Sequence, residues 1–319
     1  MQDSLIGLFM MLIIFLAVGY PMAWAAEKFP QKNVTLIVTR EPGGSTDIQA
    51  RGLQGFLQKY LGVPVVVENV TGGGGTVGYT RTFTSKPDGY TLMVYPFLSA
   101  MISEVQQEVK YKVVEYTPIA AFCEQVLGLV VNPEVYAGLP QFLEAAKGKT
   151  MNIGTSGHGS VSHLDAMFTC DTLKLNARYV PFGGGAENLN ALVGKHIDAT
   201  MVSVFSAYGL VSSGKLKILF VLSDKRSTTF PEFPTAKELG HTLPFIQFVV
   251  GTAGPPGVPK DIVKILEDAH LKTFEDPEFQ AWAKKAKLEY APLNSKGYKD
   301  VVDEGYKVLQ SVKDKIKKM

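Results

Sequence analysis

Cysteine is nearly absent from this chain, and so are long runs of one charge. Its 319 residues include two cysteines, Cys123 and Cys170, so neither a disulfide framework nor a cysteine metal site is expected. The pair is open to two interpretations: one disulfide in an oxidising compartment, or two free buried thiols. The formal net charge is +2, and the one basic block, within residues 313–318, is typical of a solvated helix end. These features argue against nucleic-acid binding.

Catalytic signatures are missing as well. The sequence shows no Walker motif, no Cys/His pair and no pair of catalytic carboxylates. The serine-rich loop of residues 154–163 lacks the G-x-S-x-G spacing of a hydrolase. His158 and His163 are five residues apart, which is not the i, i+4 spacing of a helical metal site. The sequence therefore predicts a protein that is not an enzyme and that has no metal and no cofactor.

An apolar stretch opens the chain. Residues 5–18 are almost continuously apolar and are followed by Gly19-Tyr20-Pro21 and then by Ala23-Trp24-Ala25. This order is typical of a secretory signal peptide cleaved near Ala25, and the stretch is short for a membrane span. The first residues carry Asp3 and no Lys or Arg, which leaves an uncleaved anchor open as an alternative. A signal peptide at residues 1–25 predicts an exported protein.

From residue 27 onward, strand-like segments alternate with helix-like segments. The strands have continuous rather than alternating apolar character, as expected for buried parallel strands. The predicted strands are 34–38, 63–70, 90–95, 150–153, 177–180 and 199–204. They form two successive βαβαβ units, one in each half of the chain.

Two such units predict an α/β protein with two lobes, each a doubly wound sheet with ligand loops at the carboxyl ends of its strands. Apolar stretches at residues 126–131 and 245–250 are the expected crossings between the lobes. The first lobe is expected to comprise residues 26–125 and 247–319, and the second lobe residues 126–246.

Glycine-rich loops follow the first two strands of each unit. In the loop from Arg40 to Asp47, glycines let the backbone approach a ligand, and the next helix adds a positive partial charge that suits a carboxylate or phosphate. Ser45 is expected to be the N-cap, with Asp47 in the first turn. A plain capped turn is the alternative. Arg40 is expected to pair either with an anionic ligand or with Glu41.

The second loop, Gly73 to Gly78, fits the pattern G-x-G-x-x-G and so offers a dinucleotide-binding enzyme as an alternative. Three observations count against it. Four consecutive glycines match many patterns, the loop follows the second strand rather than the first, and the preceding loop already provides a competing anion site.

The second half of the chain has two more loops of this kind. In the loop of residues 154–163, Ser160 is expected to cap the following helix and to lend hydrogen bonds to a ligand. His163 is expected to be a structural residue at the helix end rather than a base. Phe182, which precedes Gly183 and Gly184, either packs on an apolar part of a ligand or belongs to the core.

Many short strings, in order, resemble a known family. They are Phe29-Pro30, Pro42-Gly43-Gly44-Ser45-Thr46-Asp47, Leu61-Gly62-Val63-Pro64-Val65-Val66-Val67-Glu68-Asn69, Gly74-Gly75-Thr76-Val77-Gly78, Lys86-Pro87-Asp88-Gly89-Tyr90-Thr91-Leu92, Gly157-His158-Gly159-Ser160, Val180-Pro181-Phe182, Leu192-Val193-Gly194 and Ala253-Gly254-Pro255-Pro256-Gly257-Val258-Pro259. Together they span nearly the whole mature chain. They resemble the substrate-binding proteins of tripartite tricarboxylate transporters, also called the Bug family.

This resemblance implies a periplasmic Venus-flytrap protein of type II, with two α/β lobes joined by crossing strands. Members bind di-, tri- or aromatic carboxylates or acidic amino acids through backbone amides and bridging waters at the loops matching 42–47 and 157–160. They deliver the solute to a membrane partner with a large and a small subunit. A monomer is expected.

Three departures from the family bear on the ligand. The family often has Pro, an aromatic residue and Ala where this chain has Thr39-Arg40-Glu41. The loop after Phe182 usually begins with a basic residue, whereas this chain has Gly183-Gly184. The third strand leads into Tyr95-Pro96-Phe97, which is bulkier than the small polar residues expected there. These departures predict an aromatic or amphipathic carboxylate rather than plain citrate.

The expected mechanism is capture of the ligand by closure of the lobes. The residues expected to line the cleft are Thr39, Arg40, Glu41, Pro42, Gly43, Gly44, Ser45, Asp47, Gly74, Gly75, Thr76 and Tyr95 in the first lobe, and Ser156, Gly157, Gly159, Ser160, His163, Phe182, Gly183, Gly184 and Ser203 in the second. A ligand-sensing subunit for a histidine kinase has the same sequence features, so it stays open beside transport.

Overall fold

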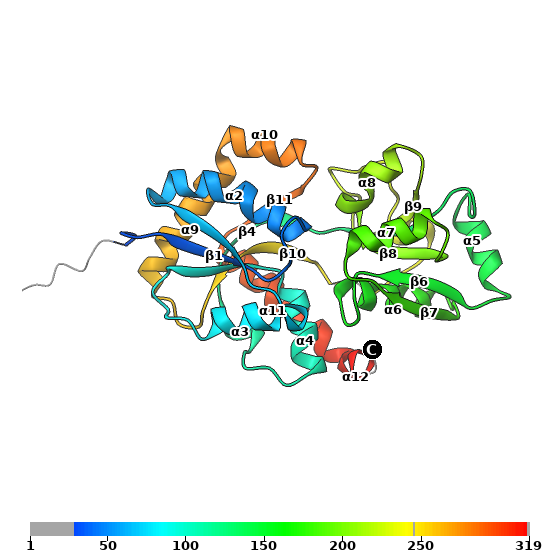
Figure 1. Ribbon diagram of the computed structural model, residues 1–319, viewed down its shortest axis with the longest axis horizontal. Helices are drawn as coiled ribbons and strands as arrows, with labels where there is room; N and C mark the ends of the chain where they lie inside the picture. The colour runs from blue at the N-terminus through cyan, green and yellow to red at the C-terminus, as the bar shows by residue number, and fades with distance from the viewer. Residues whose placement is uncertain (1–28, 245, 318–319) are drawn as a thin grey trace, which may run out of the picture.

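The computed structural model describes residues 29–244 and 246–317, and its strands fall into two separate sheets (Figure 1). The larger sheet consists of β1 (Val34–Val38), β2 (Val65–Asn69), β3 (Thr91–Tyr95), β4 (Thr117–Glu124), β10 (Val249–Gly254) and β11 (Glu289–Leu293). Their order across the sheet is β11-β4-β10-β3-β1-β2. The signal peptide predicted at residues 1–25 lies outside the described residues.

The smaller sheet consists of β5 (Leu127–Val131), β6 (Met151–Thr155), β7 (Ala177–Pro181), β8 (Ala199–Ser203) and β9 (Lys217–Leu222). Their order is β7-β6-β8-β5-β9. In both sheets the strands of the predicted βαβαβ unit are parallel to one another. The added strands next to the crossings, β10 and β5, are antiparallel to their neighbours β3 and β8.

Helices cover both sheets, as apolar parallel strands require. The larger sheet carries α2 (Ser45–Leu61), α3 (Thr76–Phe83), α4 (Phe97–Gln106), α9 (Lys260–Glu275), α10 (Pro277–Lys285), α11 (Ser295–Ser311) and α12 (Lys313–Ile316). The smaller sheet carries α5 (Leu139–Ala146), α6 (Val161–Thr172), α7 (Gly185–Val193) and α8 (Val204–Ser212). In Figure 1, α2, α9 and α10 lie on one side of the larger sheet, and α3, α4 and α11 lie on the other. This is the two-lobed α/β fold that the sequence predicts.

The chain crosses between the sheets at the predicted apolar stretches. β4 belongs to the larger sheet, and after Gln125 and Val126 the chain continues as β5 of the smaller one. It returns between β9 and β10. This division supports the lobe boundaries expected at residues 126 and 246, which remain our proposal.

Asp276 organises the helices in the C-terminal part of the first lobe. Helices α9 and α10 are separated at Pro277, because proline has no backbone N–H and cannot donate the hydrogen bond that would continue α9. Asp276 caps α10 by accepting from the Glu278 amide, and it also accepts from Lys59 and Tyr60 of α2 at 2.8 and 2.9 Å. The Lys59 hydrogen bond is the main reason that the pKa of Asp276 falls to about 2. One carboxylate therefore caps the start of α10 and links that helix to α2.

Both cysteines are free thiols in this structure. Cys123 lies in β4 of the larger sheet and Cys170 in α6 of the smaller lobe, and both are buried. Burial raises the pKa of the Cys170 thiol to about 12. Of the two interpretations of the sequence, the structure shows buried free thiols.

Two glycines of α2 provide a matched test of the packing between α2 and α10. A Cβ at Gly52 would overlap the ring of Trp282, whereas a Cβ at Gly55 would meet no atom within 4 Å. We expect Gly52→Ala to lower the free energy of unfolding by about 1–3 kcal/mol, because the ring must move out of its place. Gly55→Ala should raise it by about 0.5–1 kcal/mol, because alanine is the better helix former. Urea unfolding of both variants checks this, and equal effects would contradict the packing.

Candidate functional site

The geometry of the two sheets places the glycine-rich loops opposite each other. β4 runs parallel to β1 and β3, because β10 is antiparallel to both β3 and β4. The carboxyl ends of β1, β2 and β3 therefore lie at the edge where β4 crosses to the second lobe. In the second lobe, β6, β7 and β8 end at the edge where β5 begins. The loops that follow these strands therefore lie at the facing ends of the two lobes, and the space between them is the expected cleft.

Asp47 holds the first of these loops in shape. Its carboxylate accepts from the Gly43 amide at 2.9 Å, from Arg51 at 3.0 and 3.1 Å and from Asn69 at 2.8 Å. Burial opposes ionisation of Asp47, but these hydrogen bonds outweigh it and lower the pKa of the carboxyl. Asp47 is 2% exposed, so its role is to position the loop rather than to touch a ligand.

Ser45 is not the N-cap of α2, which corrects the sequence prediction. The N-cap is Gly44, in extended conformation, with no side-chain hydrogen bond to the helix. Asp47 of the first turn does not replace this cap: its side chain accepts from the Gly43 amide, which precedes the helix, and so holds the loop rather than the helix end. Ser45 stays partly exposed, while Glu41, Pro42, Gly43 and Gly44 are exposed at the cleft edge.

The backbone conformation of the second loop explains its run of glycines. All four residues from Gly72 to Gly75 have positive φ, between 56° and 114°, a region that side chains disfavour. The Thr76 hydroxyl closes the turn on the Gly73 carbonyl at 2.9 Å. A Cβ at Gly75 would come within 3.0 Å of the Tyr79 ring and its hydroxyl. Below the loops, the Thr39 hydroxyl is buried and has no hydrogen-bond partner among the described residues.

Tyr95 does not line the cleft, contrary to the sequence prediction. It is fully buried, its hydroxyl donates to the Val113 carbonyl at 3.2 Å, and its ring packs against Tyr116 and Phe97. Phe97 is buried as well. The bulky residues after the third strand thus belong to the core, and the inference of an aromatic ligand loses its support from them.

Ser160 caps α6, as the sequence predicts. Its hydroxyl oxygen accepts from the His163 amide at 3.2 Å and donates to the Gly157 carbonyl at 2.7 Å. The Ser162 hydroxyl accepts from the Ser156 amide at 2.7 Å. These bonds fix the loop so that Ser156, Gly157 and Ser160 are partly exposed at the cleft edge.

His163 acts as a structural acceptor. Its Nδ1 accepts from the Gly159 amide at 3.2 Å, and the ring is 4% exposed beside Tyr179 and His158. Burial, reinforced by His158, lowers the pKa of His163 to about 4. The neutral ring can accept from Gly159, whereas the protonated ring could not.

The loop after β7 and the start of α8 complete the second lobe's edge. The Phe182 amide donates to Thr155, and the Phe182 ring packs partly buried against the smaller hydrophobic cluster of this lobe. Gly183 donates to Glu187 at 2.9 Å, and Gly184 is the N-cap of α7 with open space around it. Ser203 occupies the N-cap of α8 and is partly exposed.

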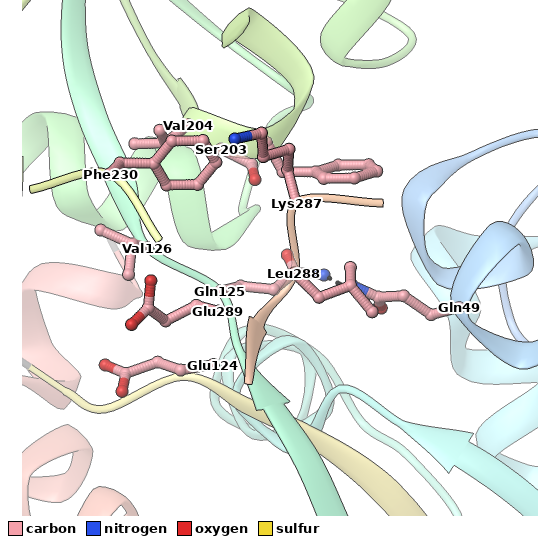
Figure 2. A pocket seen from close by; sticks show the side chains of 11 residues that line it. Gln49, Glu124, Gln125, Val126, Ser203, Val204, Phe230, Lys287, Leu288 and Glu289 are labelled. Atoms are coloured by element: carbon pink, nitrogen blue, oxygen red, sulfur yellow. Dashed lines mark hydrogen bonds between the residues drawn. The ribbon is translucent and has the colours of Figure 1, made fainter. Parts of the chain in front are cut away.

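Sequence reasoning missed a pocket at the hinge, whose lining Figure 2 shows. It combines Gln49, Glu124 and Gln125 of the first lobe with Ser203 and Phe230 of the second. The Gln125 amide lies 3.5 Å from that of Gln49. Gln49 follows Ser45 by one helical turn, so helical spacing could have indicated it.

The Glu289 carboxylate, which also lines this pocket, is a second missed feature, and it joins the two lobes. At the start of β11, it accepts from the Ser227 hydroxyl, from the amide and hydroxyl of Thr228 at 2.9 and 2.7 Å and from the Thr229 amide at 3.2 Å. Burial opposes ionisation, but these donors lower the pKa of Glu289. The partners are about sixty residues apart in sequence, and no local signal indicates such a contact.

Two further contacts join the lobes on the side of α4 and α6. Gly159 lies against the Gln106 side-chain amide at the end of α4, where any Cβ would overlap it. Lys315 of α12 pairs with Asp171 of α6 at 2.6 Å. The loop between β6 and α6 therefore touches the first lobe directly.

Comparison with known proteins identifies the chain. A family model described as "Tripartite tricarboxylate transporter family receptor" matches residues 49–317. The chain belongs to this family. Similar proteins include a UPF0065 protein of Cupriavidus necator, 30% identical over 93% of this chain and 91% of its own, and BugT of Bordetella pertussis, 32% identical over 72% of each.

Solved structures show the same fold. A TctC solute-binding protein from Polaromonas without ligand is 27% identical, with a TM-score of 0.75 over 90% of the receptor and 99% of that chain. MatC from Rhodopseudomonas palustris, solved with bound malate, is 27% identical, with a TM-score of 0.77 over 89% of the receptor and 100% of that chain. These similarities confirm the two-lobed fold of a periplasmic binding protein.

Two features are absent from the described part of the receptor. Within residues 29–244 and 246–317, no group of three or more His, Cys, Asp or Glu side chains is placed to hold a metal ion. In the same part of the chain, no helix is long and apolar enough to cross a membrane.

The two serines at the helix starts provide a test of capping. Ser160→Ala should lower the free energy of unfolding of the ligand-free receptor by about 1 kcal/mol, because the His163 amide loses its acceptor. Ser45→Ala should change it by less than about 0.5 kcal/mol, because Ser45 caps nothing. Urea titrations of the two variants measure the difference. A larger loss at Ser45 would overturn the assignment of the caps.

The acceptor role of His163 predicts a pH dependence. A histidine whose pKa is about 4 in the fold and ordinary in the unfolded chain stabilises the fold above about pH 6.5, and this contribution is lost as the pH falls towards 4. His163→Asn keeps an acceptor but does not titrate. The fall in unfolding free energy between pH 7 and pH 4.5 should be smaller in this variant by about 1–2 kcal/mol. His270, whose pKa is also lowered to about 4, is present in both proteins and cancels.

Proposed function

We propose that this receptor captures a small organic carboxylate between its lobes and delivers it to a membrane transporter with a large and a small subunit. One observation carries the proposal: α2 and α6 begin at facing edges of the two lobes, each behind a loop of exposed or partly exposed glycines and serines. Helix N-termini and free backbone amides attract anions. The malate bound in MatC, a relative of the same fold, supports a carboxylate.

Capture requires contact with both lobes at once. A ligand that reaches the Gly43–Ser45 loop and the Ser156–Ser160 loop together binds the closed arrangement better than an open one, so it shifts the equilibrium towards closure. We propose that the protein works in the periplasm as a monomer, after cleavage of a signal peptide near Ala25. Sensing of the ligand for a histidine kinase uses the same closure and remains the alternative to transport.

We also propose that the receptor catalyses no reaction. Relatives of the family are receptors. In the Gly73–Gly78 loop, which offered the dinucleotide alternative, Gly73, Gly74 and Gly75 have positive φ. A Cβ at Gly78 would come within 3 Å of Thr39 and of the Val70 carbonyl. A tight backbone turn therefore accounts for this motif without a pyrophosphate.

A plug in the cleft tests the proposed site. Gly184 has φ 176° and open space around it, so Gly184→Trp should fold normally while its ring fills the space between the lobes. We expect a thermal shift of the wild type with one or more of a panel of di-, tri- and aromatic carboxylates. Calorimetry should show at least a tenfold loss of affinity in the variant.

The matched control is Gly148→Trp, at an exposed turn of the same lobe with open space around it. This variant should bind as tightly as the wild type. If no carboxylate of the panel shifts the wild type, carboxylate capture is wrong. If the plug leaves affinity unchanged, the ligand binds elsewhere.

A further inference from the structure

Arg40 is a cation fixed at the edge of the cleft by neutral partners. Its Nη1 donates to the Gly74 carbonyl at 3.1 Å, and its own carbonyl accepts from the Asn69 side-chain amide at 3.0 Å. It follows β1 directly, so it lies at the edge that faces the second lobe. The side chain thus bridges the first two ligand loops of its lobe.

The nearby acids do not neutralise this charge. Asp47, the buried acid of the loop, is occupied by Arg51, Asn69 and the Gly43 amide. Glu41, the sequence neighbour, forms no ion pair with Arg40 in the part of the chain that the structure describes. Three other arginines do have carboxylate partners within 4 Å: Arg51 with Asp47, Arg81 with Glu68 and Arg226 with Glu238.

The remaining donors of Arg40 suit an acidic group of a ligand. A guanidinium has five N–H groups in a planar fork, and the Gly74 carbonyl takes one of them. A carboxylate can accept two parallel bonds from such a fork, which is the strongest pairing available to it. Because the bridge to Gly74 already restricts the side chain, less rotamer freedom is lost on binding.

The structure also weakens the competing interpretation of the ligand. The aromatic residues that suggested an aromatic carboxylate, Tyr95 and Phe97, are buried in the core. The first-lobe edge that faces the cleft is instead polar: it presents exposed glycines and Glu41, with Ser45 and Arg40 partly exposed. This surface favours a ligand with two separated acidic groups over one with an apolar end.

We propose that Arg40 is a specificity-determining residue, which binds a second carboxylate of the ligand while the helix N-termini bind the first. This inference rests on the proposed function, because it assumes that a carboxylate enters the cleft. It predicts that the receptor selects dicarboxylates over ligands of the same length with a single charge.

A cycle of two ligands and three proteins tests the inference. The ligands are the tightest binder among succinate, malate, glutarate and adipate, and the monoamide of the same acid. Calorimetry should show the wild type binding the dicarboxylate at least tenfold more tightly than the monoamide. Arg40→Gln should lower affinity for the dicarboxylate by about that factor and leave the monoamide almost unchanged, so the ratio falls towards one.

The matched control is Arg178→Gln. Arg178 is exposed in the second lobe, contacts the Asn152 side chain and has no carboxylate partner within 4 Å among the described residues. The substitution removes the same charge and should keep the wild-type ratio. A drop in the ratio in this control as well would indicate long-range electrostatics instead of contact.

The outcomes separate the inference from the function beneath it. If Arg40→Gln lowers the affinity for both ligands equally, Arg40 only holds the two loops together, and the inference is wrong. The inference also fails if the wild type binds the dicarboxylate and the monoamide equally well, although carboxylate capture then stands. If the wild type binds neither these acids nor any other carboxylate, the proposed function itself is wrong.

Discussion

The direction in which β4 leaves the larger sheet constrains the rest of the cleft. Because β4 is parallel to β1 and β3, it crosses to the second lobe at the edge where the other two strands also end. Each glycine-rich loop after a parallel strand is then brought to the space between the lobes. If β4 ran in the opposite direction, the same loops would point away from the second lobe. Facing loops are therefore a result of topology, and local sequence only decides what they present.

Local rules predicted those features whose partners are near in sequence. Ser160 caps α6 because its acceptor and the His163 amide are three residues apart. The same rule failed at Ser45, because the helix begins at that residue and the N-cap is Gly44. A preference of serine for the N-cap does not reveal which of two adjacent residues occupies it. The continuous apolar runs predicted the strands of both sheets for a similar reason, because a strand that is buried on both faces is apolar along its own length.

Tertiary packing determines the features that could not be predicted from the sequence. Tyr95 is the last residue of β3, and the neighbouring parallel strands end at loops of the cleft. The Tyr95 ring instead packs against Tyr116 and Tyr298, and its hydroxyl donates to the Val113 carbonyl. Glu289 finds its donors about sixty residues away. The Arg40 bridge to Gly74 spans thirty-four residues, so its choice of that carbonyl over Glu41 appears only when β1 and β2 lie side by side.

The Glu289 contacts also limit how the two lobes can separate. They join the start of β11 to the loop after β9, and β11 and β9 are the outermost strands on one side of their sheets. The lobes also touch on the side of α4 and α6, at Gly159 with Gln106 and at Asp171 with Lys315. Separation of the lobes must therefore break one of these two sets of contacts. The Lys315–Asp171 pair is solvent-exposed and contributes little, whereas the Glu289 carboxylate would leave four hydrogen bonds behind.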